Sequence, residues 1–87
     1  AEVYPNPFSN FATIDFTIEE KSNLQIIILD AQGSIIKNIQ TAELAPGNHS
    51  VTWDGTNNER RLEPNGIYLI QIITPKASQT LRVILNK

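Results

Sequence analysis

The sequence has 87 residues, 40% of them hydrophobic, and a formal net charge of −2 at pH 7. This length fits one small domain with a modest core, and the weak acidic balance lacks the basic stripe of nucleic-acid binders. The chain contains no Cys, which excludes disulfides, thiolate metal sites and Cys nucleophiles. No run approaches the ~18 consecutive apolar residues of a membrane-spanning helix, and the absence of Met indicates a piece or a mature form of a longer product.

Residues 1–10 are predicted to be an extended lead-in, because prolines at positions 5 and 7 remove ladder donors and fix φ. Tyr4 and Phe8 are expected to pin this segment to the body of the domain. From Phe11 to Ile18 the residues alternate between apolar and polar, which predicts a half-buried strand. Residues 24–30 are apolar on both faces after Gln25, as in a central strand or one whose outer face is covered.

Short runs of turn-forming residues separate the predicted strands in the rest of the chain. Asp30-Ala31-Gln32-Gly33 predicts a tight turn within a hairpin, and Ala45-Pro46-Gly47-Asn48 and Pro64-Asn65-Gly66 predict two more. The expected strands are residues 11–18, 24–30, 34–40, 49–54, 67–73 and 79–86. This spacing predicts one all-β domain over residues 1–87, an Ig-like or fibronectin-III-like antiparallel β-sandwich of six to seven strands.

The only Trp, Trp53, and one of two Tyr residues, Tyr68, lie in alternating strands beside aliphatic residues. Large aromatic side chains bury the most area, so we expect both in the core. The alternative is a sugar-stacking platform formed by the two rings.

Candidate catalytic groups lack partners in the sequence pattern. His49 is the only histidine, and its neighbour Ser50 points to the opposite face of the strand, so we interpret His49 as a strand-end residue. Asp15 and Asp54 are strand-borne carboxylates, but nothing places two carboxylates in one cleft. We therefore predict no catalytic residue, no cofactor and no enzyme activity.

Two features have open interpretations. The loop Asp54–Glu59 carries oxygen side chains that could bind calcium, or that could cap backbone amides in Asx-type turns. No metal site is assigned on this basis. The stripe Ile27, Leu29 and Ile35 would be an exposed docking patch if it lies outside the core.

Six ordered motifs resemble a known family. They are Tyr4-Pro5-Asn6-Pro7-Phe8, Ala12-Thr13-Ile14-Asp15-Phe16, Ile28-Leu29-Asp30-Ala31-Gln32-Gly33, Leu44-Ala45-Pro46-Gly47-Asn48-His49, Val51-Thr52-Trp53-Asp54-Gly55 and Pro64-Asn65-Gly66-Ile67-Tyr68. This set resembles the Ig-like domain named after the flagellar hook-capping protein, which overlaps in role with the C-terminal sorting domain of the type IX (Por) secretion system. The loop after Asp54-Gly55 departs from the family pattern, with Arg60, Leu62 and Glu63 where a later Gly and a Pro-Val pair are usual.

The resemblance implies a non-catalytic C-terminal domain that directs an exported bacterial protein across the outer membrane and anchors it at the cell surface. Its implied partners are the outer-membrane secretion machinery, a sortase-like surface peptidase and an N-terminal cargo domain, with no nucleic acid and no membrane span. The implied location is the periplasm in transit and then the cell surface or the medium. A chain that ends at Asn86-Lys87, right after its last strand, fits such a C-terminal tag.

The family's functional stretches correspond here to a turn with its strand and to the final strand. The implied recognition residues are Gly66, Ile67, Tyr68, Leu81, Arg82, Val83, Ile84, Leu85, Asn86 and Lys87. An apolar terminal strand at a sheet edge could be read by strand addition. Two alternatives stay open: a carbohydrate-binding or spacer module of a secreted hydrolase, with polysaccharide as partner, and a hook-cap assembly domain.

Overall fold

The computed structural model describes the backbone of residues 1–87 and the side chains of all of them except residues 40 and 41. The chain forms seven strands in two antiparallel sheets, with strand orders β1-β2-β5 and β4-β3-β6-β7. The strands are β1 Glu2–Tyr4, β2 Ala12–Ile18, β3 Ser22–Leu29, β4 Ile35–Leu44, β5 Gly47–Trp53, β6 Gly66–Ile73 and β7 Ser78–Leu85. The predicted all-β Ig-like sandwich of six to seven strands is confirmed.

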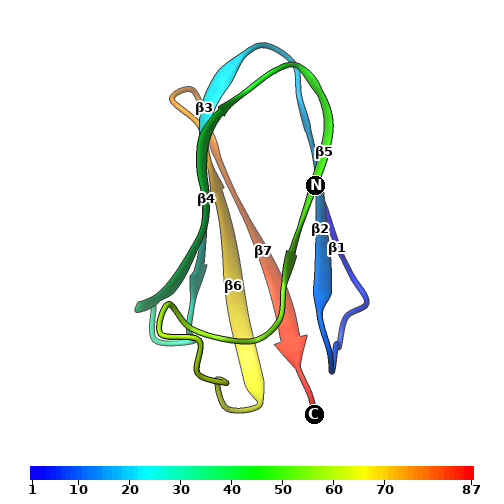
Figure 1. The fold of residues 1–87 in the computed structure, drawn as a ribbon, viewed down its shortest axis with the longest axis vertical. Helices are drawn as coiled ribbons and strands as arrows, with labels where there is room; N and C mark the ends of the chain where they lie inside the picture. The colour runs from blue at the N-terminus through cyan, green and yellow to red at the C-terminus, as the bar shows by residue number, and fades with distance from the viewer.

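The two sheets form two layers (Figure 1). The chain passes from one layer to the other three times: between β2 and β3, between β4 and β5, and between β5 and β6. The first two connections lie at the same end of the sandwich. The C-terminus lies at the opposite end, beyond β7. The last strand is thus an edge strand of the four-stranded sheet.

The core follows directly from the alternation in the sequence. In β2 the even-numbered residues Ala12, Ile14, Phe16 and Ile18 are all buried, as a strand that faces a core on one side requires. Trp53 lies at the centre of an aromatic cluster, with its ring centroid 5.4 Å from Phe8 and 5.2 Å from Tyr68. The predicted core positions of Trp53 and Tyr68 are confirmed.

The lead-in differs from its prediction in two respects. Residues Glu2–Tyr4 form a short strand that pairs with β2, because the prolines begin only at position 5 and leave these first residues their backbone donors. Phe8 is pinned in the core as expected, at 2% exposure. Tyr4 is not, since its side chain is exposed and its hydroxyl donates a hydrogen bond to Asp15 Oδ2 at 2.7 Å.

The predicted turns before and after β4 are both present, and the second is shorter than predicted. Asp30 closes the first turn, because its carbonyl accepts from Gly33 N at 3.0 Å and its carboxylate accepts from Gln32 N at 3.0 Å. Gly33 has φ +90° there, where glycine is the favoured residue. The turn expected at residues 45–48 is shorter, because Gly47 already pairs with Ile18 as the first residue of β5.

Candidate functional site

The two predicted recognition stretches, far apart in sequence, lie side by side in the structure. β6 and β7 pair in register, with Gly66 opposite Leu85 and Ile67 opposite Ile84. The ends are joined as well, because Lys87 N donates a hydrogen bond to Asn65 Oδ1 at 3.0 Å. The structure therefore brings the predicted residues into one hairpin at the edge of the four-stranded sheet.

Only half of these residues can be contacted from outside. Tyr68, Val83 and Leu85 are buried and belong to the core, and Leu81 packs partly against it. The side chains that reach the surface alternate with them, as the strand period requires. They are Ile67, Arg82, Ile84, Asn86 and Lys87.

The free edge of β7 is already occupied over its second half. Phe8 N donates to Ile84 O and Asn86 N donates to Phe8 O, both at 2.9 Å. The Asn6 side chain satisfies two more groups: its Nδ2 donates to Arg82 O at 3.0 Å and its Oδ1 accepts from Ile84 N at 2.9 Å. Residues 6–8 thus cover the edge that strand addition would use, so the predicted strand addition has no free edge at residues 82–86.

Trp53 and Tyr68 use their polar atoms inside the domain. Trp53 Nε1 donates to Thr56 O at 2.8 Å, and the Tyr68 hydroxyl donates to Pro64 O at 2.5 Å. Burial raises the pKa of the Tyr68 phenol above its ordinary value, and the nearby charges of Glu63 and Asp30 raise it further. Because both rings are almost fully enclosed, the idea of a sugar-stacking platform on these two residues is wrong.

The oxygens of the loop Asp54–Glu59 are engaged by the loop itself. Asp54 Oδ1 accepts from the Thr56 amide at 3.1 Å and from the Thr56 hydroxyl at 2.5 Å. The hydroxyl bond lowers the pKa of the Asp54 carboxyl, since it stabilises the charged form. Asn57 Oδ1 accepts from Glu59 N at 2.9 Å and from Arg61 N at 3.1 Å. These are the predicted Asx-type turns, and they fix the loop against the domain.

The same loop covers the start of the β4 edge. Asn58 N donates to Ile36 O and its Oδ1 accepts from Asn38 N, both at 3.0 Å. This contact was not predictable from the sequence, because Asn58 lies in a polar stretch without periodicity. Such covering of a sheet edge is a common protection against unwanted pairing.

His49 is held as a structural residue. Its ring stacks on Phe16 with centroids 5.7 Å apart, and its Nε2 lies 2.8 Å from Ala45 O. A carbonyl oxygen can only accept, so the hydrogen of the neutral ring sits on Nε2. Ser50 pairs with Asp15 on the three-stranded sheet, at a different cross-strand position. The predicted strand-end interpretation of His49 is thus supported by its contacts.

An open hollow of about 780 Å³ lies between the layers at the end with the two connections, and none of the predicted recognition residues lines it. Four acidic residues line it, and two of them have a recorded partner: Asp15 accepts from Tyr4, and Glu20 pairs with Lys76. The bond to Asp15 raises the pKa of the Tyr4 phenol. Among the described residues, no group of three or more His, Cys, Asp or Glu side chains could hold a metal ion.

Sequence reasoning missed two contributors to this region. Asn6 covers the edge of β7 through its side-chain amide, and only its position between two prolines sets it apart in the sequence. Leu69 lies on the outer face of β6 between Ile67 and Gln71. The sequence does carry a signal for it: besides the buried Tyr68, Ile70 and Ile72, β6 has apolar residues at the alternating positions 67, 69 and 73, which point away from the core.

The geometry defines an Ig-like antiparallel β-sandwich with its candidate contact residues on one terminal hairpin. The FlgD Ig-like domain family matches residues 9–78, and the chain belongs to this family. The part of the chain that the structure describes has no helix able to span a bilayer.

Two curated relatives are similar over part of the chain. The basal-body rod modification protein FlgD of Escherichia coli K12 is 42% identical over 45 residues, which cover 52% of this chain and 20% of that protein. The protein of the same name from Salmonella typhimurium is 38% identical over 45 residues and is covered to 19%. The matched segment thus spans about a fifth of the length of these relatives.

Two solved structures share the fold. FlgD from Pseudomonas aeruginosa superimposes with a TM-score of 0.69 at 22% identity, over 87% of this chain and 60% of that one. PorZ of Porphyromonas gingivalis, described as an essential bacterial surface component of the type IX secretion system, superimposes with a TM-score of 0.67 at 20% identity. That match covers 99% of this chain and 11% of PorZ.

Proposed function

We propose that this chain is a non-catalytic assembly domain of an exported bacterial protein, of the kind found in flagellar hook-capping proteins. The observation that carries the proposal is membership of the FlgD Ig-like domain family over residues 9–78. The internal contacts agree with it, because His49, Trp53 and the Asp54–Glu59 loop direct their polar atoms to the protein's own backbone. Such groups stabilise a rigid body rather than act on a substrate.

The test is deletion of this domain from the tagged full-length protein in its own host. The expected result is loss of hooks in electron micrographs and loss of the tagged protein from purified hook–basal bodies. Normal hooks, with the shortened protein still present in them, would contradict the proposal.

A second candidate is the type IX sorting and surface-anchoring domain. The likeness to PorZ favours it, because that match covers 99% of the chain and so includes β7, whereas the family match ends at residue 78. In this case the recognition residues are Gly66, Ile67, Tyr68 and Leu81 to Lys87. The partners are the outer-membrane secretion machinery and a sortase-like surface peptidase, which act on an N-terminal cargo domain.

The sorting candidate is tested with the intact domain, because removal of Leu81–Lys87 would also remove the buried Val83 and Leu85 from the core and unfold the sandwich. A periplasmic reporter is fused to residues 1–87 and expressed in a host with type IX machinery. The reporter should become accessible to externally added protease, and only in cells with intact machinery. A folded fusion that stays in the periplasm would rule out sorting.

A further inference from the structure

The two outer faces of the sandwich differ in chemistry. On the three-stranded sheet, the residues of β2 that point away from the core are Thr13, Asp15 and Thr17, as expected for a solvated face. On the four-stranded sheet, the outward residues of β6 include Ile67 and Leu69. Of these two strands, only β6 therefore carries apolar side chains on both of its faces.

The strand register gathers these side chains into one surface. Leu29 lies opposite Ile35 on one side and Leu69 on the other, and Leu69 lies opposite Arg82. Ile67 and Ile84 are directly paired beside this row. We define the apolar face by these residues: Leu29, Ile35, Ile67, Leu69, Arg82 and Ile84.

The apolar face is open to solvent. Ile35 is 61% exposed and Ile67 is 44% exposed, while Leu29, Leu69 and Ile84 are half-buried by their neighbours. Ile27, the first member of the predicted stripe, is only 5% exposed. The stripe is therefore not a uniform patch. Its exposed part continues across β6 and β7 instead.

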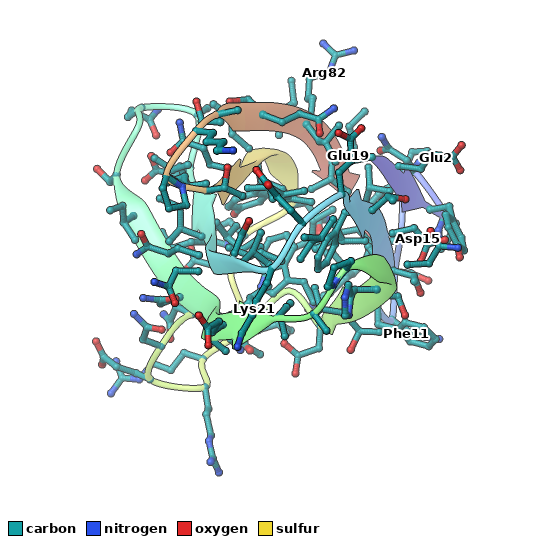
Figure 2. All side chains as sticks on the ribbon, turned by 90° about the horizontal axis from the view of Figure 1, so that it is seen from above. Glu2, Phe11, Asp15, Glu19, Lys21 and Arg82 are labelled. Carbon is teal, nitrogen blue, oxygen red and sulfur yellow. The ribbon has the colours of Figure 1, made fainter. Side chains whose placement is uncertain are left out.

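Arg82 gives the apolar face its charge. It is the only charged residue in β3, β6 and β7, and no salt bridge to a described residue engages its guanidinium. Figure 2 shows its side chain pointing away from the body, whereas Glu2 and Asp15 lie on the other layer. Exposed apolar patches mark protein-interaction sites, and Arg is enriched at protein interfaces.

Residues 6–8 cover the backbone edge of β7 over its second half, so a partner can reach that half only through the side chains on the outer face of the sheet. Because Asn6 and Phe8 satisfy the edge-facing backbone groups of Ile84 and the carbonyl of Arg82, a partner cannot pair with this stretch without removing the buried Phe8 from the core. The side chains of Arg82 and Ile84 remain reachable from the face. A partner that contacts the predicted recognition hairpin would thus do so by its side chains.

We propose that the apolar face is the surface through which a partner protein binds this domain. The partner presents apolar side chains to Ile35, Leu69 and Ile67 and a carboxylate to the Arg82 guanidinium. This inference rests on the proposed function, in which the domain serves as an assembly or sorting module, and it names the contact surface of that module.

The test compares variants in the tagged full-length protein. The double variant Ile67→Thr/Ile84→Thr and the single variant Arg82→Glu should each lower the assembled or surface-delivered fraction at least about tenfold, the loss typical of hot-spot residues. Arg82→Lys keeps the charge and should lower it about threefold or less. Thr52→Glu, on the exposed face of the other sheet, is the matched control and should leave the fraction unchanged. Thermal unfolding of each variant confirms that it is folded.

The outcomes separate this inference from the proposed function. If deletion of the whole domain changes neither assembly nor delivery, the proposed function fails and this inference fails with it. If deletion abolishes either assembly or delivery and the two face variants behave like the parent in that assay, only the assignment of the apolar face is overturned. Light scattering on the purified domain tests whether a second copy of the chain, rather than a different protein, covers the apolar face. A dimer that Ile67→Thr/Ile84→Thr converts to a monomer would show that it does.

Discussion

Replacement of Phe8 by Ala should destabilise the domain more than its place near the N-terminus implies. The ring is 2% exposed and lies 5.4 Å from the Trp53 ring. Its backbone joins the lead-in to β7 through two hydrogen bonds of 2.9 Å. Loss of the ring therefore leaves a cavity in the aromatic cluster and removes the anchor that holds residues 6–8 on the sheet edge.

The expected cost is about 4 kcal/mol, within the range of about 3–5 kcal/mol for a buried Phe→Ala change. A domain of 87 residues has a total stability of roughly 4–13 kcal/mol, so this one change removes a large part of it. The corresponding fall in melting temperature is roughly 15–30 °C for a domain of this size.

The measurement is a urea titration followed by the fluorescence of Trp53, the single Trp, and by far-ultraviolet circular dichroism. The second signal is needed because Phe8 contacts the Trp53 ring and its loss changes the fluorescence directly. Phe11→Ala is the matched control, since Phe11 is 53% exposed and should cost about 1 kcal/mol or less. A cost for Phe8→Ala below about 1 kcal/mol, or no larger than that of Phe11→Ala, would refute the anchoring role.

Three further predictions follow from single contacts. Asn6→Ala should cost about 1–2 kcal/mol in urea titration, because it leaves two backbone groups of β7 without their partners; an unchanged midpoint would contradict this. Tyr68→Phe should cost about 1 kcal/mol through its lost bond to Pro64. Because the Tyr68 pKa is raised in the folded state, the parent should lose stability as the pH rises above about 10, and the variant should lose less. Thr56→Ala should raise the lowered pKa of Asp54 towards its ordinary value of about 3.9, and NMR titration of the carboxyl group in parent and variant measures this change. In the parent, the contribution of Asp54 to the free energy of unfolding is present above that pH and is lost on acidification.

Strand patterns with clear alternation were predictable from the sequence. In β2 the apolar residues face the core and the polar residues face away from it, so period-two alternation indicates the element and its buried side. Strand β1 has three residues and is too short for any periodicity. Its pairing with β2 depends on the position of the rest of the sheet, which local sequence does not encode.

The residues of the candidate site were predictable from the sequence, but which of their groups a partner can reach was not. The resemblance pointed to Gly66–Tyr68 and the last strand, and antiparallel pairing brings these segments together. The cover over the β7 edge depends on Asn6, whose contacts lie more than 70 residues away in the chain. The apolar face likewise requires the register of four strands, since its members come from β3, β4, β6 and β7.

The bonds between Phe8 and the segment Ile84–Asn86 have a consequence for biosynthesis. During translation the ribosome makes Phe8 long before it makes the residues that receive it, so this part of the sandwich cannot close until β7 has been made. A product that stops before β7 would leave the Phe8 backbone and one edge of β6 unpaired and would expose apolar surface to proteases. Completion of the fold therefore reports that translation has passed β7.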